Sequence, residues 1–281
     1  LPSGPIRIIV GFPPGGGTDA LARIVAAKLT QLWGTQVIVE TKAGVAGVLL
    51  PASGFAPTRV VELRTMQHMA GDVTGRSVLD LACGFGFYGR AMLLAGAASA
   101  HGVDQSPEMV ALGRRISAGA GDAMTFQASD FLQLAPVREY DLAVAAFLFN
   151  YAQSLDELAR MAAAAFKHVR AGGRIAVETM NPDYCLADGD CSKYGVRVLD
   201  DVPWQQGAKM EMEFLGDPPA RITVFRWARA HYEQAFAQAG FTDLVWQAPC
   251  LLEQDRLAQP PGYWDDLLRN GLAAWFSCTK P

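Results

Sequence analysis

The chain has 281 residues, of which 51% are hydrophobic and 19% charged, and its formal net charge is −4. This composition is ordinary for a globular protein, and the small negative charge gives no reason to expect a nucleic-acid or membrane-surface partner. The longest apolar runs, such as residues 142–149, are too short to span a bilayer. We therefore expect a cytoplasmic protein that binds neither membrane nor nucleic acid.

The cysteines give the same indication about the compartment. There are five, an odd number, and they are spread widely, with no two at the spacing of a zinc site. We interpret them as free thiols in a reducing compartment, and we predict no metal site.

The first fifty residues have the pattern of one strand–helix–strand unit. Residues 6–10 are mostly β-branched, a glycine-rich loop follows over 11–19, and Thr18 or Asp19 can cap an apolar helix that ends at Gly34. A second strand is expected over 35–40. A unit of this size is too small to be stable alone.

From residue 59 onward, strand and helix patterns alternate. Strands are predicted over 77–82, 99–104, 124–130, 140–149, 174–180, 222–228, 241–247 and 273–279, and helices over 59–70, 87–95, 107 onward, 155–169 and 230–240. This alternation predicts an α/β fold with a doubly wound, mostly parallel, seven-stranded Rossmann-like sheet, and ligands at the carboxyl ends of its strands. We predict an N-terminal βαβ segment over 1–50, a linker over 51–58 and the main domain over 59–281.

A glycine-rich turn follows the first strand of the main domain, in the stretch VLDLACGFGFYGR (78–90). Its glycines fit the G-x-G-x-x-G pattern that holds a dinucleotide pyrophosphate. Asp80 would face a pyrophosphate unfavourably, however, and suits a ligand with positive charge, such as the ammonium and sulfonium groups of S-adenosylmethionine (SAM). Asp104, at the end of the next strand, can accept both ribose hydroxyls of NAD or of SAM.

The third strand ends in Ser129-Asp130-Phe131. An acid followed by an aromatic residue offers an acceptor for an adenine amino group and a ring to lie against the base. Together with Asp80, this pair favours SAM over NAD.

These motifs resemble those of the class I SAM-dependent methyltransferases. Over residues 58–280 the chain looks closest to a small-molecule branch that contains the toxoflavin-type N-methyltransferases, which share the glycine loop and the later Asn150-Tyr151-Ala152 and Asn181-Pro182-Asp183. The resemblance implies transfer of a methyl group from SAM to a nitrogen or oxygen of a small molecule by in-line displacement.

The resemblance also implies roles for single residues. The residues implied at the cofactor are Asp80, Ala82, Cys83, Gly84 and Gly86 at the methionine part, Asp104, Gln105 and Met109 at the ribose and adenosine, Ser129, Asp130 and Phe131 at the adenine, and Ala146 at the amino acid part. Tyr151 and Asn181 would position the acceptor, with Glu178 and Tyr184 as further candidates. Phe131 and Met109 are also typical core residues, and Asn181-Pro182-Asp183 is equally typical of a turn.

The N-terminal segment resembles the opening of another family, the periplasmic solute-binding receptors of tripartite tricarboxylate transporters. The resemblance rests on IRIIVGFPPGGGTDALARIV and covers only residues 1–50, which indicates a fusion. Two other functions stay open: an NAD(P)-dependent oxidoreductase, and a non-catalytic protein that binds SAM or another solute.

Overall fold

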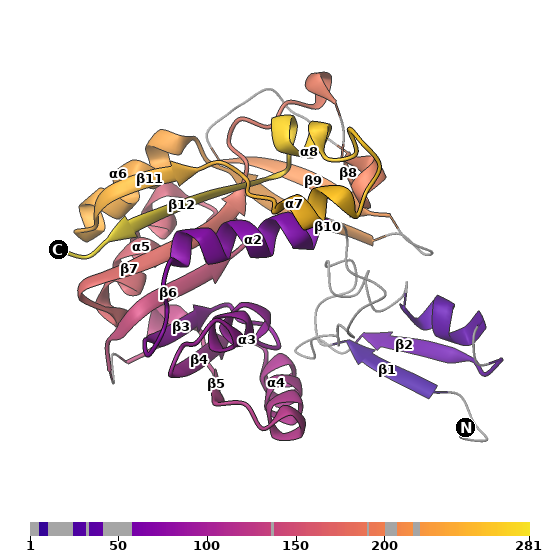
Figure 1. Cartoon of the computed structure of the whole chain (residues 1–281), viewed down its shortest axis with the longest axis horizontal. Coiled ribbons are helices and arrows are strands. Elements are labelled where there is room, and N and C mark those ends of the chain that lie inside the picture. Colours follow the sequence, from indigo (N-terminus) through magenta and orange to yellow (C-terminus); the bar gives the residue numbers. More distant parts are fainter. Residues whose placement is uncertain are drawn as a thin grey trace.

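The computed structural model describes residues 6–10, 25–31, 34–41, 58–135, 138–189, 191–199, 207–215 and 220–281 (Figure 1). Near the N-terminus, β1 (Ile6–Val10) and β2 (Val37–Thr41) form a parallel two-stranded sheet, with helix between them over residues 25–31. This is the strand–helix–strand order expected from the sequence. The predicted loop over 11–19 and residues 51–57 of the predicted linker lie outside the described residues.

The main sheet has seven strands in the order β11-β12-β7-β6-β3-β4-β5. The strands are β3 (Ser77–Leu81), β4 (Ser99–Asp104), β5 (Met124–Ala128), β6 (Tyr140–Ala146), β7 (Val169–Met180), β11 (Thr242–Gln247) and β12 (Ala273–Thr279). All neighbouring pairs from β7 to β5 are parallel, whereas β12 runs antiparallel to both β7 and β11. The predicted doubly wound, mostly parallel seven-stranded sheet is confirmed.

Helices cover both faces of this sheet and enclose two hydrophobic cores. The longer helices are α2 (Thr58–Ala70), α3 (Phe87–Leu94), α4 (Pro107–Ala120), α5 (Leu155–His168) and α6 (Arg229–Ala239), and α7 (Glu253–Leu257) and α8 (Asp265–Asn270) are short. Buried residues of α2, α3, α4 and α8 pack in the first core, and those of α5 and α6 pack in the second. Alternate residues of one strand face opposite sides of a sheet, so Val144 belongs to the first core and Ala145 to the second.

Two helix starts follow the capping rules. The Ser106 hydroxyl accepts the Met109 N–H at 3.2 Å at the start of α4, and the Ser154 hydroxyl accepts the Glu157 N–H at 3.1 Å at the start of α5. Serine is among the residues preferred at this position, and both hydroxyls fix where the chain enters a helix.

Two strand boundaries were predicted wrongly. β6 ends at Ala146 rather than at residue 149, because Phe147 takes a left-handed backbone (φ 52°) and its N–H donates to the Glu178 carbonyl at 2.8 Å. β7 begins at Val169 rather than at residue 174. Beyond the end of β12, the Gly172 N–H donates to the Lys280 carbonyl at 2.8 Å and the Lys280 N–H donates to the Gly173 carbonyl at 2.9 Å, so this segment extends the sheet.

A small antiparallel sheet in the order β10-β9-β8 follows β7 in the chain. It consists of β8 (Val196–Val198), β9 (Ala208–Phe214) and β10 (Ala220–Arg226). Of these, only β10 overlaps a predicted strand. In β9, Met210 and Met212 are buried and Glu211 is exposed, and this alternation is the signal that could have predicted the strand.

Candidate functional site

Asp80 lies at the carboxyl end of β3, with its side chain 1% exposed. One carboxylate oxygen accepts the Gly89 N–H of α3 at 2.8 Å. Burial raises the pKa of Asp80 to about 7, although the Gly89 hydrogen bond lowers it, and the nearby Asp104 raises it further. The ionised form of this buried acid has one hydrogen-bond donor, the Gly89 N–H. A positively charged ligand beside it would therefore be favoured, because an opposite charge stabilises the ionised form.

Asp104 ends β4, beside the glycine turn. Its Oδ2 accepts the Gly84 N–H and its Oδ1 accepts the Ser106 N–H, both at 2.8 Å. The carboxylate thereby joins the turn to the start of α4, and burial raises its pKa. Since a carboxylate oxygen has two lone pairs, each oxygen can still accept one hydroxyl of a ligand.

The turn from Ala82 to Gly86 has a left-handed backbone at three positions. Ala82, Gly84 and Gly86 have φ values of 54°, 54° and 91°. At Gly86 a side chain is also sterically excluded, because a Cβ atom would lie 2.7 Å from the Met124 sulfur. The turn is closed by the Gly86 N–H, which donates to the Cys83 carbonyl at 2.8 Å. A turn of this shape presents backbone groups to a ligand at close range.

Arg90 holds this turn in place, a role that the sequence reasoning missed. Its guanidinium donates to the Phe85 carbonyl in the turn, to the Asp122 carboxylate at 2.9 Å, and to the Gly113 carbonyl and Ser117 hydroxyl of α4 at 2.7 and 2.8 Å. One side chain thus fixes the turn to α4 and to the residues before β5. In the sequence, Arg90 is only the last residue of the glycine-rich stretch.

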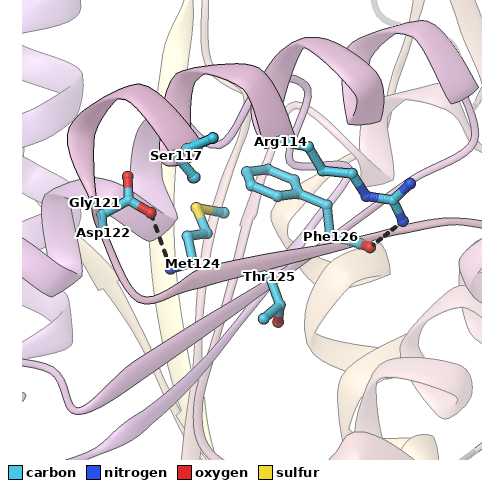
Figure 2. A pocket seen from close by; sticks show the side chains of 8 residues that line it. Arg114, Ser117, Gly121, Asp122, Met124, Thr125 and Phe126 are labelled. Atoms are coloured by element: carbon cyan, nitrogen blue, oxygen red, sulfur yellow. Dashed lines mark hydrogen bonds between the residues drawn. The ribbon is translucent and has the colours of Figure 1, made fainter.

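A pocket lies at the end of α4 and the start of β5 (Figure 2). Its lining includes Asp122, which accepts the Met124 N–H at 3.0 Å, and Arg114, which donates to the Phe126 carbonyl at 2.7 Å. The pocket lies at the amino end of β5, whereas Asp80 and Asp104 end their strands. It is therefore separate from the candidate site, although Arg90 contacts both regions.

The residues after β5 lie next to Asp104. The Ser129 N–H donates to the Asp104 carbonyl at 2.9 Å. The Asp130 side chain is exposed and caps a short 3-10 helix, accepting the Leu132 N–H at 3.0 Å. Phe131 is only 8% exposed and packs in the second core, so its ring is a core ring in this structure. A contact between Asp130 or Phe131 and adenine stays a prediction.

Two further residues implied at the adenosine have different environments. Gln105 is exposed directly after Asp104, whereas Met109 is 7% exposed. The Met109 methyl group would lie 3.1 Å from a Cβ atom at Gly84. Both residues therefore border the turn and Asp104, with Met109 packed against the turn.

At the acceptor side, the two predicted positioning residues have different environments. Tyr151 follows β6 and is 52% exposed. The Asn181 amide is used within a turn, because its Nδ2 donates to the Gly271 carbonyl at 2.8 Å and its Oδ1 accepts the Asp183 N–H at 3.0 Å. This geometry favours the turn interpretation of Asn181, and its role toward the acceptor stays a prediction.

Asn150, next to Tyr151 in the chain, has a buried side-chain oxygen without a hydrogen-bond partner in the described part of the chain, whereas the side-chain oxygen of Asn181 is paired. Its side chain is 1% exposed, and its Oδ1 atom has no hydrogen-bond partner among the described residues. An unpaired buried oxygen costs about 1–3 kcal/mol. Such an atom is a candidate to accept a hydrogen bond from a ligand.

A second buried acid, Glu178, lies two residues before the end of β7, on the face that α2 and α3 cover. It is 0% exposed, and Tyr88 donates to its Oε2 at 2.6 Å. Burial and the nearby Glu62 raise the pKa of Glu178 well above its usual range, although Tyr88 and Arg59 act to lower it. Arg59 itself pairs with Glu62 at 3.0 Å. These four residues form the α2–β7 cluster.

The described part of the chain also bears on metal binding, membrane spans and disulfides. No group of three or more His, Cys, Asp and Glu side chains there could hold a metal ion. No helix in those ranges is both long and apolar enough to cross a membrane. No disulfide joins the five cysteines, all of which lie within the described residues.

Two comparisons bear on the fold and the glycine turn. Residues 78–173, which include the turn, Asp80 and Asp104, match the family described as a methyltransferase domain. The fold is similar to that of an S-adenosylmethionine-dependent methyltransferase from Mesorhizobium loti, with a TM-score of 0.57 and 20% identity, covering 79% of this chain and 99% of the other.

Curated relatives match shorter parts. The ribosomal protein L11 methyltransferase of Stenotrophomonas maltophilia is 38% identical over 130 residues, which is 44% of this chain and 39% of the relative. A UPF0065 protein of Pseudomonas sp. strain P51 is 48% identical over 49 residues, 17% of this chain and 15% of the relative. The chain thus spans well under two thirds of these relatives, and the resemblance of residues 1–50 to transporter receptors stays a prediction. Residues 78–173 thus match a methyltransferase domain, and the Rossmann-like fold around them is similar to that of a solved S-adenosylmethionine-dependent methyltransferase.

Proposed function

We propose that this chain transfers a methyl group from SAM to a nitrogen or oxygen of a small molecule. The observation that carries the proposal is the pair of buried acids, Asp80 and Asp104, on either side of a left-handed glycine turn within a methyltransferase domain. The free thiols fit a reducing compartment, so we place the enzyme in the cytoplasm.

The residues present fit SAM in their chemistry. Asp104 keeps acceptor capacity for two ribose hydroxyls, the backbone of the turn can approach the methionine part, and Asp80 supplies a buried negative charge for its ammonium group. When bound, SAM supplies a methyl group on a positively charged sulfur, which a nucleophile displaces in line. The protein's part is to position the two reactants and exclude water.

The acceptor would lie beside Tyr151 and Asn150. The Asn150 Oδ1 atom can accept a hydrogen bond from an N–H or O–H group of the acceptor, and the half-exposed Tyr151 offers an aromatic side chain. Similarity to ribosomal protein L11 methyltransferases favours one rival acceptor class, a ribosomal protein.

Calorimetric titration with SAM, S-adenosylhomocysteine (SAH) and NAD tests the proposed function. We expect SAM and SAH to bind and NAD not to bind, because Asp80 would repel a pyrophosphate. Binding of NAD alone would establish the oxidoreductase alternative. An acceptor screen with labelled SAM, including heterocyclic amines and ribosomal protein L11, then separates the acceptor classes. Binding without transfer to any of them would support the non-catalytic alternative.

Substitution of Arg90 tests whether a preformed turn matters for SAM binding. We expect Arg90→Met to weaken SAM binding about tenfold, the equivalent of about 1.4 kcal/mol, because four acceptors lose their shared donor and the turn becomes mobile. Arg90→Lys should recover part of this loss. Isothermal titration measures both.

Arg114→Met is the matched control, because Arg114 also anchors α4 to β5 but donates to Phe126 and not to the turn. It should leave SAM affinity unchanged. Equal losses in the Arg90 and Arg114 variants would mean that Arg90 acts only through general stability.

A further inference from the structure

Glu178 lies on the same face of the main sheet as Asp80. Asp80 pairs in register with Val144, and Val144 pairs with Ala176. Glu178 comes two residues after Ala176, so it faces the same side, one step closer to the carboxyl edge of the sheet. The first turn of α3 contacts both acids, because the Gly89 N–H donates to Asp80 and the adjacent Tyr88 hydroxyl donates to Glu178.

The charges around Glu178 do not balance when it is ionised. From α2, Arg59 and Glu62 face it, and they form an ion pair with each other. From α3 it receives the Tyr88 hydroxyl, and from β12 it faces the indole of Trp275, its cross-strand neighbour. The Trp275 Nε1 and Glu178 Oε1 atoms have no hydrogen-bond partner among the described residues. Among the described residues that face Glu178, the one cation is already paired, so burial and the nearby Glu62 oppose its ionisation and raise the pKa of Glu178 well above its usual range.

The register also places Glu178 next to the predicted methionine end of the site. Ala146, implied at the amino acid part of the cofactor, is the direct register partner of Glu178. The Phe147 N–H bonds to the Glu178 carbonyl at 2.8 Å. A positive charge brought to this edge of the sheet would therefore lie close to the Glu178 carboxyl group, in surroundings of low polarity where charges interact strongly.

We propose that Glu178 balances the positive charge of the methyl donor: neutral in the empty site, ionised with SAM bound, and protonated again by the acceptor during transfer. The inference rests on the proposed function. Ionised Glu178 stabilises the positive charge of the sulfonium. Once the sulfonium has become a neutral thioether, the negative carboxylate no longer has a positive partner and takes up a proton.

This cycle limits the chemical class of the acceptor. A bond forms between the methyl carbon and the nucleophilic atom, the carbon–sulfur bond breaks with its electron pair on sulfur, and the proton of the nucleophilic atom passes to the Glu178 carboxylate, directly or through the Tyr88 hydroxyl. The acceptor must therefore carry a proton on the atom that is methylated, as amines, N–H heterocycles and hydroxyl compounds do. Tertiary amines and thioethers are excluded.

The test measures protons released on binding. Calorimetric titration at pH 7 in two buffers of different ionisation enthalpy gives the number of protons released by SAM and by SAH. Both ligands carry the ammonium that faces Asp80, so any proton released there cancels in the comparison. We expect SAM to release up to about one proton more than SAH, because only SAM carries the sulfonium.

Glu178→Gln should remove this difference, weaken SAM binding about tenfold and leave SAH binding within about twofold. Glu213→Gln is the matched control, a buried acid of the small sheet that pairs with Arg197 and Arg221, and it should change neither quantity. Should Glu178→Gln fail to fold, Tyr88→Phe takes its place. Loss of the Tyr88 hydroxyl raises the pKa of Glu178 further, so the extra proton release should move to higher pH.

Equal proton release by SAM and SAH in the unaltered protein would overturn the inference. So would extra proton release by SAM that persists in Glu178→Gln, or that occurs at an unchanged pH in Tyr88→Phe. In each of these cases both ligands still bind, so the proposed function stands. If neither ligand binds, the proposed function fails instead.

Discussion

Asp104→Ala should weaken SAM binding by about 1.5–4 kcal/mol, which is roughly tenfold to 1000-fold in the dissociation constant. Two effects add in this variant. The ribose hydroxyls lose a charged acceptor, and the Gly84 and Ser106 N–H groups, both now held at 2.8 Å, lose their common partner. The turn and the start of α4 are then no longer joined. Isothermal titration with SAM measures the effect.

Asp141→Ala is the control for this prediction. Asp141 accepts the Ser77 N–H at 2.8 Å and bonds to Arg170, but it lies at the amino end of β6, the opposite edge of the sheet. We expect this variant to lose stability and to keep its SAM affinity. Unchanged SAM binding in Asp104→Ala would sink the assignment of Asp104 to the ribose.

Asp80→Asn should make the protein more stable at pH 8, on the order of 3 kcal/mol in the free energy of unfolding, while weakening SAM binding. The amide oxygen of Asn can still accept the Gly89 N–H, but the buried group no longer carries charge. The site would therefore lose its negative partner for the ammonium group and the fold would lose a destabilising charge. Urea denaturation and SAM titration of the same variant measure the two effects.

The pH dependence gives this prediction its sign. The pKa of Asp80 is about 7 in the folded state, above the value of 3.8 for an unperturbed aspartate. Below about pH 4 the group is protonated in both states and costs nothing. As the pH rises from about 4 to 7, the unfolded state releases its proton first, so the folded state loses stability relative to it. The gain in Asp80→Asn should therefore be large at pH 8 and vanish near pH 4.

Asp141 gives the opposite sign within the same sheet. Hydrogen bonds from Ser77 and the Arg170 ion pair lower its pKa to about 2, so its stabilising contribution is present above about pH 4 and is lost as the pH falls toward 2. Asp141→Asn should thus be destabilising at pH 7, whereas Asp80→Asn is stabilising.

Equal stability of Asp80→Asn and the unaltered protein at pH 8 would contradict the free-energy cost that we assign to burying the ionised Asp80 carboxylate.

Much of the main domain could be predicted because its signals are local. The strand-end acids Asp80 and Asp104 and the caps Ser106 and Ser154 follow from short patterns, and the structure confirms these positions. The small sheet was mostly missed, because strands as short as β8 have little periodicity and their pairing is set by distant residues.

The parts of the site that depend on tertiary contacts could not be read from local patterns. Arg90 closes a hydrogen-bond network across α3, α4 and the start of β5, and nothing adjacent in the sequence marks its partners. In the same way, Tyr88 and Glu178 meet although they lie 90 positions apart in the chain. Asn150 shows the limit of motif reading, since it and Tyr151 share one motif but differ completely in exposure.

The placement of β12 between β7 and β11 has a consequence for synthesis on the ribosome. β11 precedes β12 in the chain, yet it joins the sheet only through β12 (Figure 1). Until Ala273–Thr279 has emerged, the edge of β7 has no partner on that side and β11 has no strand to pair with. An unpaired strand edge next to exposed apolar residues is prone to aggregate. The nascent chain therefore spends the time needed to translate the segment from Met180 to Ala273 with an open sheet, which makes this interval the one in which a chaperone would matter most.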